Sequence, residues 1–266
     1  MTTAQRVIKY LAIAFAFFLI IGIITTIIAI GSGITSLFEN DEPVKTETHE
    51  LKDDSKVLNI KLGASSLTIK KGEKLKVETN NKNVKVKEEN NKVTIEETST
   101  RWSFNKKTYQ VVLYLPEDSV FADVNIETGA GKLSVSKIES KNLVLKLGAG
   151  KTTIDNVKTN NTKIETGAGE LVIKNGKLNN AKIEVGVGKL DVKAEFTGDA
   201  KIETGVGSNS IKLLPTENNY KIEFKKGLGS VKYNGKEVSD GSIIGEGSNL
   251  IKIEGGIGSI NVKEEK

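Results

Sequence analysis

A Gly-x-Gly tripeptide recurs along this 266-residue chain at a fixed interval, and this recurrence constrains the fold more than any other feature. Five copies follow one another every 19 positions, at Gly129/Gly131, Gly148/Gly150, Gly167/Gly169, Gly186/Gly188 and Gly205/Gly207. Two looser copies follow after wider steps, at Gly227/Gly229 and Gly256/Gly258. Gly63-Ala64-Ser65 resembles an eighth, degenerate copy. A fixed period of this length is typical of repeat proteins, in which each unit stacks on its neighbours.

Apolar residues flank each tripeptide in pairs that are separated by two positions. They stand three and five positions before the first glycine and four and six after it, as at Thr162/Ile164 and Leu171/Ile173 around Gly167. Alternation with a period of two indicates a β-strand with one buried face. Each unit therefore predicts a strand, a Gly-x-Gly turn, a second strand, and a second turn rich in Asn, Gly or Lys.

Two strands per unit fit either a β-solenoid coil or an antiparallel meander. The residue three positions before the turn is Ile, Leu or Phe in all seven units. Like residues stack on like when coils lie directly above one another, whereas a strand of a meander would neighbour the other half of the unit. We therefore predict an all-β fold, a parallel β-solenoid with about 19 residues per coil and Gly-x-Gly turns.

The glycines have a structural reason and a functional alternative. A tight corner needs positive φ or a close approach of the backbone, which glycine allows without strain. A phosphate-cradling loop would instead need a helix that begins at the glycines, and no helical pattern exists after Leu37. We therefore interpret the glycines as corners of the coil.

Charged residues recur at the outward positions and form two columns. Lysine stands four positions before the turn at Lys163, Lys182, Lys201 and Lys252, and glutamate two before it at Glu127, Glu165, Glu184, Glu203 and Glu254. Strands about 4.8 Å apart bring like charges together, which parallel Lys and Glu columns offset. We expect a solubilising surface first and a binding strip second, with Lys163, Lys182 and Lys201 as its candidate residues.

The N-terminal part keeps the same rhythm less clearly. Apolar pairs such as Leu58/Ile60 and Leu67/Ile69 recur every eight or nine positions. Residues 98–107 break the pattern with Trp102 and Phe104. We expect Trp102 to plug or cap the solenoid, with stacking on a ligand as the alternative.

The N-terminus predicts a membrane anchor. Leu11–Ile30 is an uninterrupted apolar run of about 20 residues, the length that crosses a bilayer. A cleavable signal peptide is the alternative, but its apolar stretch is usually about 7–15 residues, and no Ala-x-Ala follows here. We therefore predict an uncleaved transmembrane signal anchor over residues 11–34.

The flanking charges predict the orientation of this anchor. Arg6 and Lys9 precede the apolar run, and Glu39, Asp41 and Glu42 follow it. Positive charge stays in the cytoplasm, so residues 1–10 should be cytoplasmic and the repeats extracytoplasmic, which places the protein in a bacterial cell membrane.

Between the anchor and the repeats the chain is polar and strongly charged. Residues 35–56 are predicted to be a stalk, and 57–266 the β-strand-repeat domain. His49 is the only histidine and lies in this stalk, where it is neither a metal ligand nor a general base.

Catalytic, cofactor and metal-binding motifs are absent from the sequence. There is no cysteine, which excludes thiolate chemistry and disulfides. The repeats lack the Asp of calcium-binding solenoid units, and coils this short leave no loop from which to build a catalytic cleft. The formal net charge is +5, and acidic residues and lysines are interspersed along the chain. This pattern indicates a solvated surface, and we expect no nucleic-acid partner. We predict that the protein is not an enzyme.

The stretch VVLYLPEDSVFADVNIETGAGKLSV, residues 111–135, together with the repeats up to Val262, resembles the putative-adhesin family of bacterial β-strand-repeat domains. The resemblance covers most of residues 57–262. It implies a right-handed β-solenoid, often behind a membrane segment, with members near envelope-stress signalling genes. The longer steps at Gly227 and Gly256 depart from regular repetition, so we expect distorted last coils.

Three functions remain open at this point. The first is a non-enzymatic interaction module, an adhesin or envelope-binding protein, whose partner is a component of the cell envelope or a membrane protein. The second is an accessory of envelope-stress signalling that binds a membrane sensor through residues 11–30. The third is a scaffold that polymerises end to end.

Overall fold

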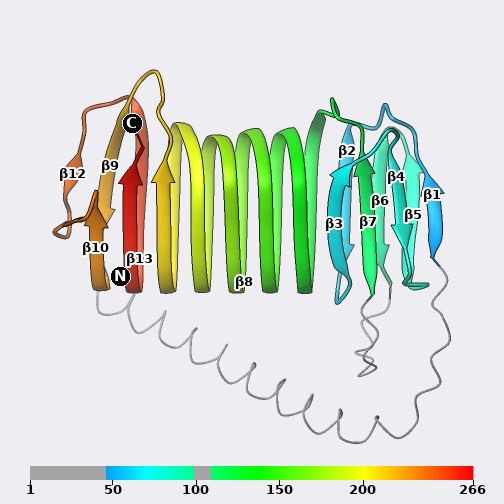
Figure 1. The fold of residues 1–266 in the computed structure, drawn as a ribbon, viewed down its shortest axis with the longest axis horizontal. Coiled ribbons are helices and arrows are strands. Elements are labelled where there is room, and N and C mark those ends of the chain that lie inside the picture. Colours follow the sequence, from blue (N-terminus) through cyan, green and yellow to red (C-terminus); the bar gives the residue numbers. More distant parts are fainter. Residues whose placement is uncertain (1–45, 99–108, 266) are drawn as a thin grey trace, which may run out of the picture.

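The computed structural model describes residues 46–98 and 109–265, and every regular element within them is a β-strand (Figure 1). β8, Phe121–Leu213, is a continuous strand of 93 residues that winds into stacked coils. Asn161 Nδ2 donates to Asn142 Oδ1 at 2.9 Å, and Lys158 Nζ to Glu139 Oε1 at 2.7 Å, both across 19 positions. The predicted β-solenoid and the period of its coils are confirmed, while its right-handed sense stays a prediction.

Side chains from all sides of each coil fill its interior. The residue three positions before each corner is at most 2 % exposed, at Ile126, Leu145, Ile164, Ile183, Ile202, Phe224 and Ile253. Burying such a side chain fully stabilises the fold by about 1.5–3 kcal/mol. Because each coil is too narrow to enclose a core alone, this stabilisation requires the coils above and below.

The two glycines of a corner meet different steric demands. Gly150 has a φ of 135°, which L side chains rarely adopt. Gly148 lies outside the positive-φ residues, but a Cβ there would overlap the carbonyl oxygen of Gly129 in the coil before. Close approach of backbones therefore explains the first glycine, and positive φ together with close approach explains the second.

The order of the coils at the C-terminal end departs from the order of the sequence. β9, Tyr220–Lys225, and β10, Leu228–Tyr233, form the last coil. β13, Asn249–Glu264, pairs in parallel with β8 on one side and with β9 and β10 on the other. The end of the chain is thus inserted as the penultimate coil. This corrects the expectation of distorted last coils, because these coils are in register and only their order is changed.

The N-terminal end shows the same permutation. β2, Val57–Leu62, and β3, Ser66–Lys71, stack directly on the first coil of β8, although residues 72–120 intervene in the chain. β6, Lys92–Glu97, and β7, Gln110–Leu115, pair in parallel with the outer side of β2 and β3. A Cβ at Gly129 would meet the carbonyl oxygen of Gly63, so Gly63-Ala64-Ser65 is a corner of the same stack. Trp102 lies outside the described residues.

Antiparallel strands cover both ends of the stack. At the N-terminal end, β4, Lys76–Thr79, pairs with β7, and β5, Val84–Glu89, pairs with β6. At the other end, β11, Lys236–Glu237, pairs with β10, and β12, Ile243–Ile244, pairs with β9. These short strands interrupt the parallel edges that would otherwise template further pairing.

The outermost strand at the N-terminal end corrects the predicted stalk. β1, Glu47–Glu50, pairs with β4, and Asp53 Oδ1 accepts a hydrogen bond of 2.7 Å from the backbone of Leu75. The part of residues 35–56 that the structure describes therefore belongs to the domain, and His49 lies in a strand. The anchor predicted for residues 11–34 lies outside the described residues, and within the described ones no helix is long and apolar enough to cross a membrane.

Candidate interaction surface

The two predicted columns of charge lie on one outward face of the solenoid. Parallel register places Lys252 beside Lys201, and Glu254 beside Glu203. Within β8 the column lysines reach along their own strands to the glutamate two positions on, at 2.6 Å for Lys163 to Glu165 and 2.8 Å for Lys201 to Glu203. Lys182 pairs with Glu184 in the same way. The structure brings Lys163, Lys182 and Lys201 into one line, as predicted, but every one of them is ion-paired.

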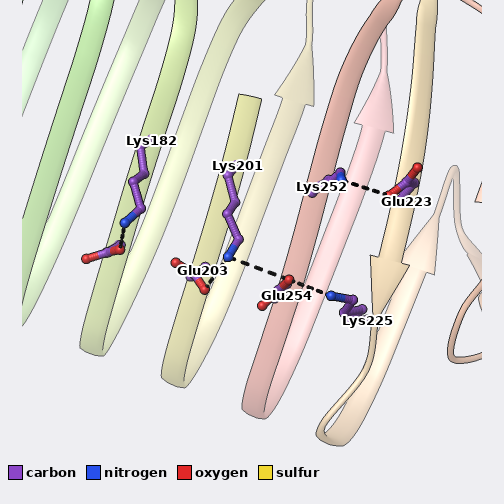
Figure 2. Close-up of polar contacts among 8 residues, drawn as sticks. Lys182, Lys201, Glu203, Glu223, Lys225, Lys252 and Glu254 are labelled. Carbon is purple, nitrogen blue, oxygen red and sulfur yellow. Dashed lines mark hydrogen bonds and ion pairs between the residues drawn. The ribbon is translucent and has the colours of Figure 1, made fainter. Parts of the chain in front are cut away.

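The charge pattern inverts on the last coil. β9 carries Glu223 where the neighbouring β13 carries Lys252, and Lys225 where it carries Glu254. Glu254 consequently accepts contacts from Lys225 at 3.0 Å and from Lys201 at 3.7 Å, and Lys252 lies 3.6 Å from Glu223 (Figure 2). Sequence reasoning missed this pairing, although the reversed order of Glu and Lys at residues 223–225 was a visible signal.

A second polar cluster lies at the corner between β2 and β3. Glu97 Oε2 accepts hydrogen bonds from the backbone N–H groups of Gly63, Ala64 and Ser65, at 2.8, 3.0 and 3.2 Å. Asn81 Nδ2 donates to the other carboxylate oxygen at 2.8 Å. In the next coil the corner instead donates to a carbonyl, from Ala130 to Gly63 at 2.8 Å. For the corner between β2 and β3, the Glu97 carboxylate thus takes the place that a backbone carbonyl takes in the next coil.

The repeats, the corners and the strands preceding them match a known family. The model of Toastrack DUF4097 matches residues 52–242. The chain belongs to the Toastrack DUF4097 family. Among curated proteins none matches this chain.

The solved structures that match this chain are distant from it in sequence. A putative cell adhesion protein from Clostridium sporogenes is 18 % identical and has a TM-score of 0.40, over 83 % of this chain and 99 % of its own. A putative adhesin from Parabacteroides distasonis is 12 % identical with a TM-score of 0.43, over 84 % and 98 %. Another protein from that organism, described as a putative lipid binding protein, is 13 % identical with a TM-score of 0.29, over the same 84 % and 98 %.

Within this Toastrack domain the ion pairs stabilise the charged forms of both partners. The pKa of Lys182 is raised chiefly by its hydrogen bond to Glu184, and that of Lys201 by its hydrogen bond to Glu203. The pKa of Glu184 is lowered chiefly by the hydrogen bond from Lys182. Burial would raise the pKa of Glu254, but the hydrogen bond from Lys225 and the charges of Lys201 and Lys225 outweigh it, so this pKa is lowered. The lysine column therefore does not act as a free basic strip.

The described part of the Toastrack domain offers no metal centre, and four of its depressions are either very small or open to solvent. Among these residues no three His, Asp or Glu side chains gather in a way that could hold a metal ion. Two cavities behind the glycine corners measure about 10 Å³ each, room for roughly one water molecule. Larger depressions, of about 510 Å³ beside Tyr220 and about 390 Å³ over Asn59, are open to solvent.

Proposed function

We propose that this Toastrack protein is a non-enzymatic interaction module that is anchored in the bacterial cell membrane. In this proposal residues 11–34 cross the membrane once, residues 1–10 stay in the cytoplasm, and the repeat domain binds a component of the cell envelope or a membrane protein outside. The orientation is supported by Arg6 and Lys9 before the apolar run and by the acids after it.

The observation that carries the proposal is the continuous flat face built from identical positions of successive coils. In β8 the strand continues from coil to coil without a long loop, so its side chains recur at the strand spacing of about 4.8 Å. A regular row of this kind is suited to an extended or repeating ligand, because each coil presents the same groups. It is poorly suited to catalysis, which needs several different groups converging on one point.

The covered ends favour this function over a scaffold that polymerises end to end. The strands available at the ends are short or charged, as in β1 and β11. Short, charged edge strands oppose the addition of further strands. An end-to-end polymer would have to displace them first.

The membrane topology can be tested with a reporter fused after Lys266 that is active only in the cytoplasm. We expect it to be silent, and we expect alkaline carbonate to leave the full-length chain in the membrane fraction. A strongly active reporter would reverse the orientation and restore the scaffold, and a mature fragment that begins near residue 38 would show that the apolar run is a cleaved signal peptide.

Binding can be tested by pull-down on purified cell wall over a salt series. The test variant carries Lys163→Gln, Lys182→Gln and Lys201→Gln, and a control with the same change of charge carries Lys158→Gln, Lys174→Gln and Lys177→Gln away from the columns. We expect weaker binding and a smaller salt dependence for the first variant only, because exposed charges act through screened fields. Equal binding by both variants would remove the lysine column from the binding surface.

A further inference from the structure

Three of the corners differ from the others in a way that the fold does not require. They read Gly-apolar-Gly-Ser, at Gly205–Ser208, Gly227–Ser230 and Gly256–Ser259, and their middle residues are Val206, Leu228 and Ile257. The corners at Gly129, Gly148 and Gly167 have alanine in the middle and a charged residue after the second glycine. Alanine is therefore sufficient to form the corner, so the fold does not require the larger side chains.

The insertion of β13 brings these three corners together. Ile257 pairs with Val206 on one side and with Leu228 on the other. Ser259 pairs with Ser208 and Ser230 in the same way, and its hydroxyl lies 3.2 Å from that of Ser208. We call these six residues the serine-corner patch. In sequence order the corner of Leu228 would lie between the other two. The row Val206, Ile257, Leu228 therefore exists only in the folded protein.

The serine-corner patch exposes apolar surface and carries no charge. Leu228 is 58 % exposed, and among the described residues only Val120 and Ile243 are other large hydrophobic side chains with comparable exposure. Val206 and Ile257 are half-buried. The patch contains only apolar and small polar side chains. Contact with an apolar phase would therefore not remove water from any charged group of the patch.

The chain from the predicted anchor arrives at the same edge of the solenoid. Glu47 pairs with Thr79 of β4, and Thr79 pairs with Val111 of β7. Val111 pairs with Leu67, and Leu67 pairs with Leu133, which lies just after the corner of Gly131. The start of β1 is therefore on the corner side, at the lower edge in Figure 1, where β9 ends and β10 begins. The serine-corner patch occupies this edge at the opposite end of the stack.

We propose that the row of corners lies against the outer leaflet of the membrane. The anchor would hold one end of the solenoid and the serine-corner patch the other, so that the domain lies along the bilayer instead of standing away from it. This inference rests on the proposed anchor. The segment from residue 35 to residue 46 reaches at most about 43 Å, so the domain stays near the bilayer at high local concentration. A patch too small to bind lipid on its own can then bind while tethered.

The absence of cysteine allows a direct test on the full-length chain. A single Ser230→Cys variant, labelled with a fluorophore, is reconstituted in vesicles that contain lipids with nitroxide headgroups. The control probe is Asn160→Cys, in the turn on the other side of a coil. We expect strong quenching at residue 230 and little at residue 160. Quenching at residue 230 should persist in phosphatidylcholine as well as phosphatidylglycerol vesicles and at high salt, because the contact at the serine-corner patch is apolar.

Two further substitutions provide matched controls in the labelled chain. Leu228→Glu should abolish quenching at residue 230, because it places a charge in the patch. Ile243→Glu should leave it unchanged, because Ile243 is equally exposed, at 58 %, and lies at the same end of the stack, but on β12 away from the corners. Equal effects of the two substitutions would overturn the proposal.

The remaining outcomes separate this inference from the proposed function. Failure of the protein to float with the vesicles would remove the anchor and with it both proposals. Flotation without quenching at residue 230 would keep the anchor and overturn the lying orientation. Quenching that disappears when the protein is diluted in lipid, together with disulfide cross-links between two chains of the unlabelled Ser230→Cys variant, would assign the patch to a second copy of the chain and overturn contact with lipid.

Discussion

Within one corner tripeptide the three residues meet different constraints. The second glycine combines positive φ with contact to the coil before it, as at Gly150 above Gly131. The first glycine is needed only because the backbones of neighbouring coils approach closely there. The middle residue points outward and varies from Ala149 to Val187 and Leu228, so it is the position at which a corner can carry function without loss of the fold.

Substitution within one corner should therefore separate these constraints. Gly150→Ala should lower the free energy of unfolding by about 1–3 kcal/mol, because alanine is strained at this φ and its Cβ would overlap the Gly131 carbonyl. Ala149→Val should change it by no more than about 0.5 kcal/mol, because valine already occupies this position in other corners. Urea denaturation of both variants checks the pair. Equal stability of the two would contradict the assignment of φ to the second glycine.

Among the elements, the strands next to the ends determine where the stack stops. Glu97, at the end of β6, accepts hydrogen bonds from the three N–H groups of the corner between β2 and β3. At the other end, β9 carries Glu223 and Lys225 in the order that complements β13. Each ion pair between β9 and β13 contributes at most about 1 kcal/mol, because it is partly exposed. Its main effect is therefore on the order of the coils and less on their stability.

The role of Glu97 predicts a clear difference from its neighbour Glu96. Glu97→Ala should lower the free energy of unfolding by about 1–3 kcal/mol, since it leaves part-buried N–H groups without their acceptor. Glu96→Ala should stay within about 0.5 kcal/mol, because Glu96 is exposed on the outer face. Thermal unfolding of the two variants measures this difference. A loss of stability for Glu96→Ala as large as that for Glu97→Ala would contradict the role of Glu97 as the acceptor for this corner.

In the whole molecule a segment near each end of the described chain lies one coil inside the end of the stack, although β1 itself is the outermost strand. β2–β3 and β13 lie one coil inside the ends, and the outer coils are formed by segments from the interior of the sequence. Each outer coil is held by the coil inside it and by a short antiparallel strand. The C-terminal coil therefore depends on residues that are synthesised after it.

Truncation after Ser248 tests this arrangement. Removing β13 should abolish protection from hydrogen exchange throughout β9 and β10, because their parallel partner is lost, while β8 stays protected up to its last coil. Exchange followed by mass spectrometry measures both regions in one experiment. If β9 and β10 remained protected after truncation, they would be stacked directly on β8, in sequence order.

The sequence by itself determined the period of the coil, the inward residues, the glycine corners and the line of Lys163, Lys182 and Lys201. These features could be predicted because they depend on residues close in the chain and on a period that repeats. It did not determine the order of the end coils, the strand at Glu47–Glu50 or the partner of each lysine. All coils share one apolar pattern, so the coil of Ile253 and the coil of Phe224 would fit equally well above Ile202. Which of the two coils stacks there depends on pairing between strands that are far apart in the sequence. Only the tertiary structure decided that choice, through backbone register, the charges of β9 and the strands that cover the ends.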